Sequence, residues 1–165
     1  MLNGNTALVT GSTSGIGLGI AKALARQGAN IVLNGFGDVD TPRAEVLAAG
    51  QASGAQVAYH GADMSRAADI EDLMRYSEAQ FGQVDILVNN AGIQHVANVE
   101  DFPVGRWDAI IAINLTSAFH TSRLALPAMR RANWGRIINV ASVHGPVGSA
   151  QKSAYVAAKH GIVGL

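Results

Sequence analysis

Ser142, Tyr155 and Lys159 have the residue types and the spacing of an acid/base group. Tyr155 and Lys159 are four residues apart, so on a helix they share one face and the ammonium lies beside the phenol. A positive charge there favours the ionised form of a tyrosine, which otherwise titrates only near pH 10. The serine hydroxyl could orient the reacting oxygen. These residues predict a tyrosine that exchanges a proton with a substrate.

A glycine-rich segment near the start of the chain predicts a dinucleotide site. It follows the apolar run 7–9 and opens a segment with apolar residues at helical spacing. A strand, a glycine turn and a helix in this order bring backbone N–H groups to a pyrophosphate, whereas the alternative is an ordinary glycine-rich turn. The predicted phosphate-binding residues are Gly11, Thr13, Ser14, Gly15, Ile16 and Gly17.

The elements that must position these residues alternate along the chain. Strands are expected near 6–9, 29–33, 56–59, 85–88 and 136–140, and helices near 15–27, 42–52, 66–81, 107–131 and from 151 onward. This alternation predicts an α/β fold, a Rossmann-type doubly wound parallel sheet with helices on both faces, as a single NAD-binding domain over residues 1–165. Pro127 should kink the fourth helix or mark its fraying end.

Two further groups of residues are expected at the ligand edge of this sheet. Asn90, Ala91 and Gly92 follow the fourth strand, where open α/β folds bind ligands beyond the carboxyl ends of their strands. Phe36, after the second strand, is either a wall for an adenosine or an ordinary packed aromatic.

Together these features resemble the short-chain dehydrogenase/reductase family over the whole chain. The resemblance rests on the glycine pattern, residues 89–92, Asn114, Ser142 and residues 155–159. It implies that Tyr155 is the catalytic base in oxidation and that Lys159 also holds the nicotinamide ribose. It implies further that Asn114 completes a proton relay through a water, although Asn114 could instead be a buried polar group satisfied locally.

The resemblance also bears on the cofactor. It implies that Asp63 bonds the adenine amino group and that Met64 supplies the adjoining backbone, although Asp63 could instead cap the next helix. No arginine or lysine follows the second strand or lies in the glycine loop, so a 2′-phosphate has no cation to bind. NAD is therefore favoured over NADP, with Asn34 in place of the usual acidic ribose ligand and Asp38 as a repulsive group.

Gln94, His144 and Lys152 are predicted to bind the substrate, together with Ser142 and Tyr155. Lys152 precedes Tyr155 by three residues on the same predicted helix, so the two should share a helical face, and the other two residues follow strand ends. Each alone could instead be a solvent-facing side chain. Their combination resembles family members that oxidise D-3-hydroxybutyrate to acetoacetate, in which a glutamine, a histidine and a lysine bind the carboxylate. The alternatives are a carbonyl reductase for acyl-carrier thioesters or sugars, and a cofactor-binding module without turnover.

Composition limits the partners. Lysine plus arginine and aspartate plus glutamate each total 12, so no basic excess attracts nucleic acid or an anionic membrane. There is no cysteine, and the histidines show no arrangement of metal ligands. We expect a cytoplasmic protein that acts on a small hydroxy acid or keto acid. We also expect a homotetramer, and a chain truncated at its C-terminus, because the last helix has no cap or breaker.

Overall fold

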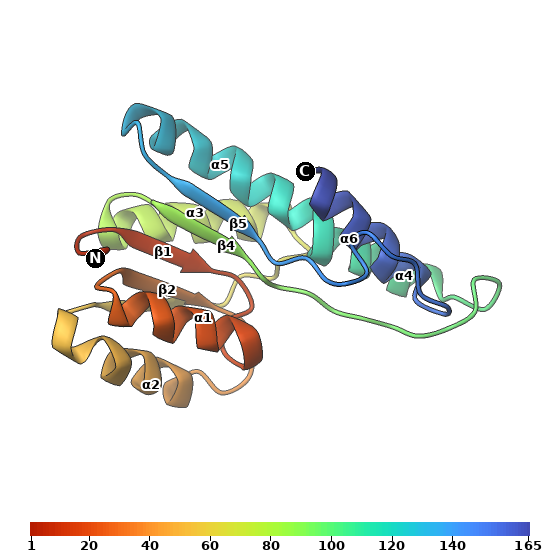
Figure 1. The fold of residues 1–165 in the computed structure, drawn as a ribbon, viewed down its shortest axis with the longest axis horizontal. Coiled ribbons are helices and arrows are strands. Elements are labelled where there is room, and N and C mark those ends of the chain that lie inside the picture. Colours follow the sequence, from red (N-terminus) through yellow and green to blue (C-terminus); the bar gives the residue numbers. More distant parts are fainter.

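The computed structural model describes residues 1–165, which form a five-stranded parallel sheet with helices on both faces (Figure 1). The order across the sheet is β3-β2-β1-β4-β5. The strands are β1 (Thr6–Val9), β2 (Asn30–Asn34), β3 (Val57–His60), β4 (Ile86–Asn89) and β5 (Arg136–Asn139). The doubly wound α/β sheet predicted from the sequence is confirmed.

Six α-helices surround the sheet. Helices α1 and α2 cover one face, α3 and α5 cover the other, and α4 and α6 lie side by side beyond the carboxyl ends of the strands (Figure 1). They are α1 (Gly15–Arg26), α2 (Asp40–Gly50), α3 (Ala67–Phe81), α4 (Val104–Ile111), α5 (Ser117–Arg131) and α6 (Ser153–Gly164), with a 3₁₀ turn η1 (Gln51–Ser53) and a π-helical turn η2 (Ala112–Thr116).

The central strands feed two separate cores. Ala7 and Val9 of β1 pack into the core under α1 and α2, while Leu8 between them packs into the core under α3 and α5. Successive side chains of a strand point to opposite faces, so a strand buried on both faces must be apolar throughout. These cores fix the positions of the strand ends, from which the functional loops leave.

The segment 107–131, predicted as one helix, begins earlier and is interrupted. Helix α4 starts at Val104, and a π-helical turn separates it from α5. Pro127 does not mark a frayed end, because α5 continues to Arg131. Pro127 and Arg123, whose carbonyl loses its helical partner, are both exposed, so water can bond the freed carbonyl.

None of the helices combines the length and the apolar character needed to cross a lipid bilayer. No cluster of three or more histidine, aspartate or glutamate side chains could hold a metal ion.

Candidate active site

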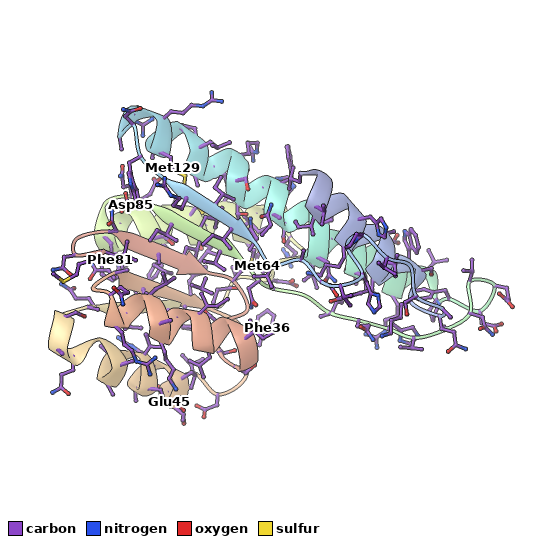
Figure 2. The ribbon with its side chains drawn as sticks, in the orientation of Figure 1. Phe36, Glu45, Met64, Phe81, Asp85 and Met129 are labelled. Atoms are coloured by element: carbon purple, nitrogen blue, oxygen red, sulfur yellow. The ribbon has the colours of Figure 1, made fainter.

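A cavity of about 470 Å³ lies at the carboxyl ends of the strands, where the strand order reverses between β1 and β4. Figure 2 shows Phe36 and Met64 at this end of the sheet. Twelve predicted cofactor residues line the cavity: Gly11, Thr13, Ser14, Gly15, Ile16, Gly17, Phe36, Asp63, Met64, Asn90, Ala91 and Gly92. The structure thus brings four separate predicted segments to one concave site, while the other two cofactor candidates, Tyr155 and Lys159, do not line it.

The glycine loop is held by asparagine side chains on either side. The Gly11 N–H donates to Asn34 Oδ1 at 3.2 Å, and the Gly11 carbonyl accepts from Asn90 Nδ2 at 2.9 Å. A Cβ at Gly17 would collide with the Gly11 oxygen and with Asn90 Nδ2, so only glycine lets α1 begin this close to the loop. The N-terminus of α1 therefore opens directly into the cavity, as a phosphate site requires.

Asp63 does not cap α3, whose N-cap is Arg66 without a side-chain bond; it closes the turn before the helix, and only one of its oxygens is used. Its Oδ1 accepts from the Ser65 N–H at 2.8 Å and from the Ser65 hydroxyl at 2.7 Å, while Oδ2 has no hydrogen-bond partner in the protein. The two bonds from Ser65 hold the pKa of Asp63 below its usual value, so the carboxylate stays ionised. The bonds to Ser65 therefore leave Oδ2 available for an adenine amino group.

Asp38 is bound to the start of α2. Its Oδ1 accepts from the Asp40 N–H at 3.1 Å and from the Thr41 N–H at 3.3 Å. Hydrogen bonds from Thr41 and from the Asp40 backbone lower the pKa of this exposed carboxyl. The backbone donors that could receive a phosphate at this helix terminus already hold a carboxylate.

The predicted acid/base pair lies on α6. Tyr155 is half-buried and Lys159 is buried, and the Lys159 Nζ lies 5.7 Å from the centre of the Tyr155 ring. The same Nζ donates to the Val140 carbonyl oxygen at 2.6 Å, a contact that the sequence did not reveal. Burial lowers the pKa of Lys159. The single bond to Val140 leaves two ammonium protons for other acceptors.

The loop after β5 brings Ser142 and His144 to the same helix. The Ser142 Oγ accepts the His144 N–H at 3.2 Å, and the His144 ring lies edge-on to Tyr155 at 6.3 Å. His144 Nδ1 is buried without a hydrogen-bond partner, so a ligand oxygen or hydroxyl could satisfy it. A Cβ at Gly145 would lie 2.7 Å from Val163 Cγ2, so glycine lets this loop pack against α6.

The structure gives less support to two of the predicted substrate residues, Lys152 and Gln94. Lys152 is not on the helix, because α6 begins at Ser153 and Lys152 occupies the position before it, with φ −123°. The argument that Lys152 and Tyr155 share a helical face is therefore wrong, and the position of Lys152 follows from the turn that starts α6. Gln94 is exposed and its side chain makes no hydrogen bond within the protein.

Asn114 lies in the π-helical turn η2 and is buried. Its Oδ1 accepts the Ile93 N–H at 2.8 Å, and its Nδ2 donates to the Ile93 oxygen at 2.9 Å. Both ends of the side-chain amide thus hold the loop that follows β4. The side chain is bonded within the protein, as the alternative interpretation proposed, and a relay to Lys159 through Asn114 would use its main-chain atoms or the second Nδ2 proton.

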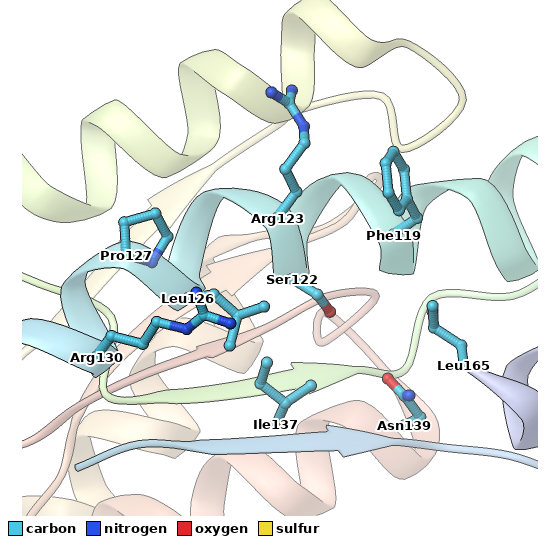
Figure 3. A pocket seen from close by; sticks show the side chains of 9 residues that line it. All are labelled: Phe119, Ser122, Arg123, Leu126, Pro127, Arg130, Ile137, Asn139 and Leu165. Carbon is cyan, nitrogen blue, oxygen red and sulfur yellow. The ribbon is translucent and has the colours of Figure 1, made fainter. Parts of the chain in front are cut away.

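A larger cavity of about 760 Å³ lies elsewhere, between α5 and β5 (Figure 3). Apolar side chains such as Leu126 and Ile137 line it together with Arg123 and Arg130, and none of the predicted site residues does. No aspartate, glutamate, histidine or tyrosine side chain lines this cavity, and Arg123 is already paired with Glu71 at 3.1 Å. This cavity lacks the groups for acid/base chemistry, so the smaller cavity is the candidate site.

Comparisons with known proteins show the family of the chain. A family described as short chain dehydrogenase matches residues 5–165. The chain is 77% identical, over its whole length, to a D-beta-hydroxybutyrate dehydrogenase of Cupriavidus necator, and it spans 63% of that protein. It is 58% identical to a D-beta-hydroxybutyrate dehydrogenase of Rhizobium meliloti, with 97% of the chain and 62% of that protein covered.

A solved structure shows the same fold. The crystal structure of a metagenomic short-chain oxidoreductase in complex with NADP superposes with a TM-score of 0.90 at 37% identity, covering 99% of this chain and 73% of that one. The parallel sheet and the glycine loop together define a Rossmann-type fold. The chain belongs to the short-chain dehydrogenase/reductase family.

Proposed function

We propose that the whole protein oxidises D-3-hydroxybutyrate to acetoacetate with NAD, in a reversible reaction. The observation that carries the proposal is that Tyr155 and Lys159 of α6 lie beside the loop that holds Ser142 and His144. The two relatives named D-beta-hydroxybutyrate dehydrogenase support the choice of substrate. Because the chain spans less than two thirds of their length, the activity is proposed for the whole protein.

The cavity fits a nicotinamide dinucleotide. The N-terminus of α1 and the glycine loop would hold the pyrophosphate, and Asp63 Oδ2 would accept from the adenine amino group. Lys159 would bond the nicotinamide ribose with one of its remaining ammonium protons. When bound, the nicotinamide accepts the hydrogen that leaves the substrate carbon with its electron pair.

The chain's own residues handle the proton. Tyr155 Oη would take the proton of the substrate hydroxyl, because the Lys159 ammonium near its ring stabilises the phenolate electrostatically. The Ser142 Oγ accepts from His144, so its own hydroxyl proton is free to bond the reacting oxygen. In the reverse direction the Tyr155 phenol would return the proton to the carbonyl oxygen.

The substrate carboxylate is assigned to Gln94, His144 and Lys152. His144 supports this most directly, because its Nδ1 is buried without a partner while its ring faces Tyr155. Lys152 would supply a positive charge at the turn into α6. An acyl-carrier thioester or a sugar offers no carboxylate at the same position and would leave these three residues without a shared purpose.

The choice of NAD over NADP rests on charge. Asp38 caps α2 beyond Phe36, and no lysine or arginine lines the cavity. A 2′-phosphate would therefore find no cation in the cavity, and the Asp38 carboxylate lies just beyond it. The neighbour solved with NADP has the same fold, so a preference for NAD would lie in these side chains.

A homotetramer and a cytoplasmic location are proposed with the activity, the location from the sequence alone. Exposed apolar side chains on α4 and α5 support assembly: Trp107 lies on α4, and Phe119 and Leu126 of α5 line the larger cavity described above. Sedimentation of the whole protein would test the assembly. A monomer at micromolar concentration would contradict it.

The activity is tested by absorbance at 340 nm, with the whole protein, D-3-hydroxybutyrate and each cofactor in turn. We expect absorbance to rise with NAD and to rise much more slowly with NADP. Turnover of a sugar or a thioester with NADPH, without turnover of the hydroxy acid, would favour the carbonyl reductase. Cofactor binding without turnover of any of these substrates would favour a binding module.

A further inference from the structure

The side chain of Asn34 occupies the position at the end of β2 where dinucleotide-binding folds usually place an acidic ribose ligand. It is only 1% exposed. Its main chain is already paired with Ser12, because Asn34 N donates to the Ser12 Oγ at 3.0 Å and the Ser12 N donates to the Asn34 oxygen at 2.6 Å. A ribose hydroxyl therefore finds little of this residue to bind.

The side-chain amide of Asn34 connects three segments. Its Oδ1 accepts from Gly11 N at 3.2 Å, while its Nδ2 donates to the His60 oxygen at 3.1 Å and to the Ala62 oxygen at 3.0 Å. Chemistry fixes this orientation of the amide, because a backbone N–H can only donate and a carbonyl can only accept. Both Nδ2 protons and the oxygen are used.

Each of these segments shapes one cavity wall. Gly11 opens the glycine loop, Asn34 ends β2, and Ala62 leads into Asp63 on the adenine side. The amide is the only side chain that bonds both the glycine loop and the loop after β3. Its bonds set the spacing between the phosphate end and the adenine end of the cavity.

We propose that Asn34 is a positioning residue that holds the adenosine half of the cofactor cavity in shape, and that it does not bind the ribose. The proposal rests on the proposed use of a nicotinamide dinucleotide. An aspartate at this position could still accept from Gly11, but it has no proton for the His60 and Ala62 oxygens at neutral pH. A buried carboxylate would then lie against two carbonyl oxygens, which repel it.

The two possible roles make opposite predictions for Asn34→Asp. If residue 34 reached the ribose, the new carboxylate would accept from the ribose hydroxyls and strengthen NAD binding. If Asn34 holds the cavity, Asn34→Asp weakens binding by about tenfold or more, because two hydrogen bonds are lost in a buried place. The substitution therefore separates a ligand from a positioning residue by the direction of the change.

The test uses calorimetric titration of the whole protein with ADP-ribose, a probe that carries the adenosine half without the nicotinamide. Asn30→Asp is the matched control, because Asn30 begins the same strand and uses only its oxygen, as an acceptor for Gln56 N. We expect weaker binding by Asn34→Asp and unchanged binding by Asn30→Asp. Unchanged or tighter binding by Asn34→Asp would overturn the proposal.

Steady-state kinetics distinguish positioning from a purely structural role. For Asn34→Asp we expect a raised KM for NAD, with kcat at saturating NAD and KM for the hydroxy acid close to wild type. A variant that loses only stability, with an unchanged KM for NAD, would overturn the proposal. Failure of the wild-type protein to bind ADP-ribose would instead overturn the proposed cofactor, and with it the proposed function.

Hydrogen exchange of the wild-type protein tests the proposal even if Asn34→Asp does not fold. In the cofactor-free protein the Gly11 N–H, which bonds Asn34 Oδ1, should exchange slowly with deuterium. The Ser14 N–H, in the same loop but with no hydrogen bond to a partner in the protein, should exchange rapidly. Equal and rapid exchange at both amides would show that the hydrogen bond from Gly11 to Asn34 is not formed, and would overturn the proposal.

Discussion

Asn114 and Ile93 are joined by two hydrogen bonds that use both ends of one side-chain amide. The two bonds join the π-helical turn η2 to the loop after β4. They satisfy both the N–H and the carbonyl oxygen of Ile93, as a neighbouring strand would in a sheet. Ile93 lines the cofactor cavity, so this pairing connects the long α4–α5 segment to the site. A π-helical turn is an irregularity that often marks a functional position, and here it directs Asn114 at the loop.

Asn114→Ala should lower the free energy of unfolding by about 1 to 3 kcal/mol, because it leaves the Ile93 N–H and carbonyl oxygen without their hydrogen-bond partner. Cofactor affinity should fall with it, since the loop then moves. Urea unfolding and NAD titration measure the two effects. Asn98→Ala, at an exposed residue, is the control and should change neither quantity by much. An Asn114→Ala protein as stable as wild type would contradict the assigned role.

Lys152→Ala should reduce kcat/KM for D-3-hydroxybutyrate by the equivalent of about 1.5 to 3 kcal/mol, the range for a hydrogen bond to a charged group. Turnover of an uncharged secondary alcohol should hardly change, because it has no carboxylate for the lysine to bind. Parallel kinetics on the two substrates provide the measurement. Equal losses on both would show that Lys152 supports the start of α6 instead of the substrate.

Asp38→Asn should improve the affinity for NADP by about two- to fivefold, the size expected for one exposed charge, and leave the affinity for NAD unchanged. The asparagine can still cap α2, so the change removes only the charge. Asp40→Asn, two residues further on and also exposed, is the matched control. The ratio of the KM values for the two cofactors measures the effect. An unchanged ratio would remove Asp38 from cofactor selection.

Lys159 gives a dependence of stability on pH. Burial lowers its pKa below the value of about 10.5 that it has in the unfolded chain. Between the lowered value and about 10.5 the unfolded chain therefore binds more protons, so stability rises with pH across this interval. The charged lysine is thus a cost below the lowered pKa, and this cost declines as the pH rises from the lowered pKa to about 10.5.

Lys159→Met removes this titration. Relative to Lys159→Met, the cofactor-free wild-type protein should gain stability as the pH is raised from neutral toward 10.5. Urea unfolding of both proteins at several pH values gives the difference. A difference that stays constant, or that moves in favour of Lys159→Met, would show that the folded protein does not disfavour the lysine charge.

The sheet could be predicted because its signals are local. Runs such as Ile31–Leu33 and Ile86–Val88 are apolar throughout, which is typical of parallel strands buried on both faces. The glycine loop could be predicted for a similar reason, since Gly17 lies where any side chain would collide with the preceding turn. In both cases the physical reason for the structure lies within a short stretch of the sequence.

The contacts between distant segments could not be predicted in the same way. Asn34 stands in the place of a ribose ligand in the sequence, yet its amide bonds carbonyls 26 and 28 residues away. Lys152 lies within one turn of Tyr155 in the sequence, but the positive φ of Gln151, 60°, delays the start of α6. Such roles depend on the assembled fold, although an asparagine ending a buried strand is a signal for them.

The central claim, that Tyr155 moves the proton, is tested most directly by the rate of acetoacetate formation in Tyr155→Phe. The substitution removes only the phenol oxygen, so the whole protein should still fold and bind NAD. The rate should fall by about 10² to 10⁴, the usual contribution of a positioned acid or base. NAD affinity close to wild type with this loss would agree with the account, and a rate within about tenfold of wild type would contradict it.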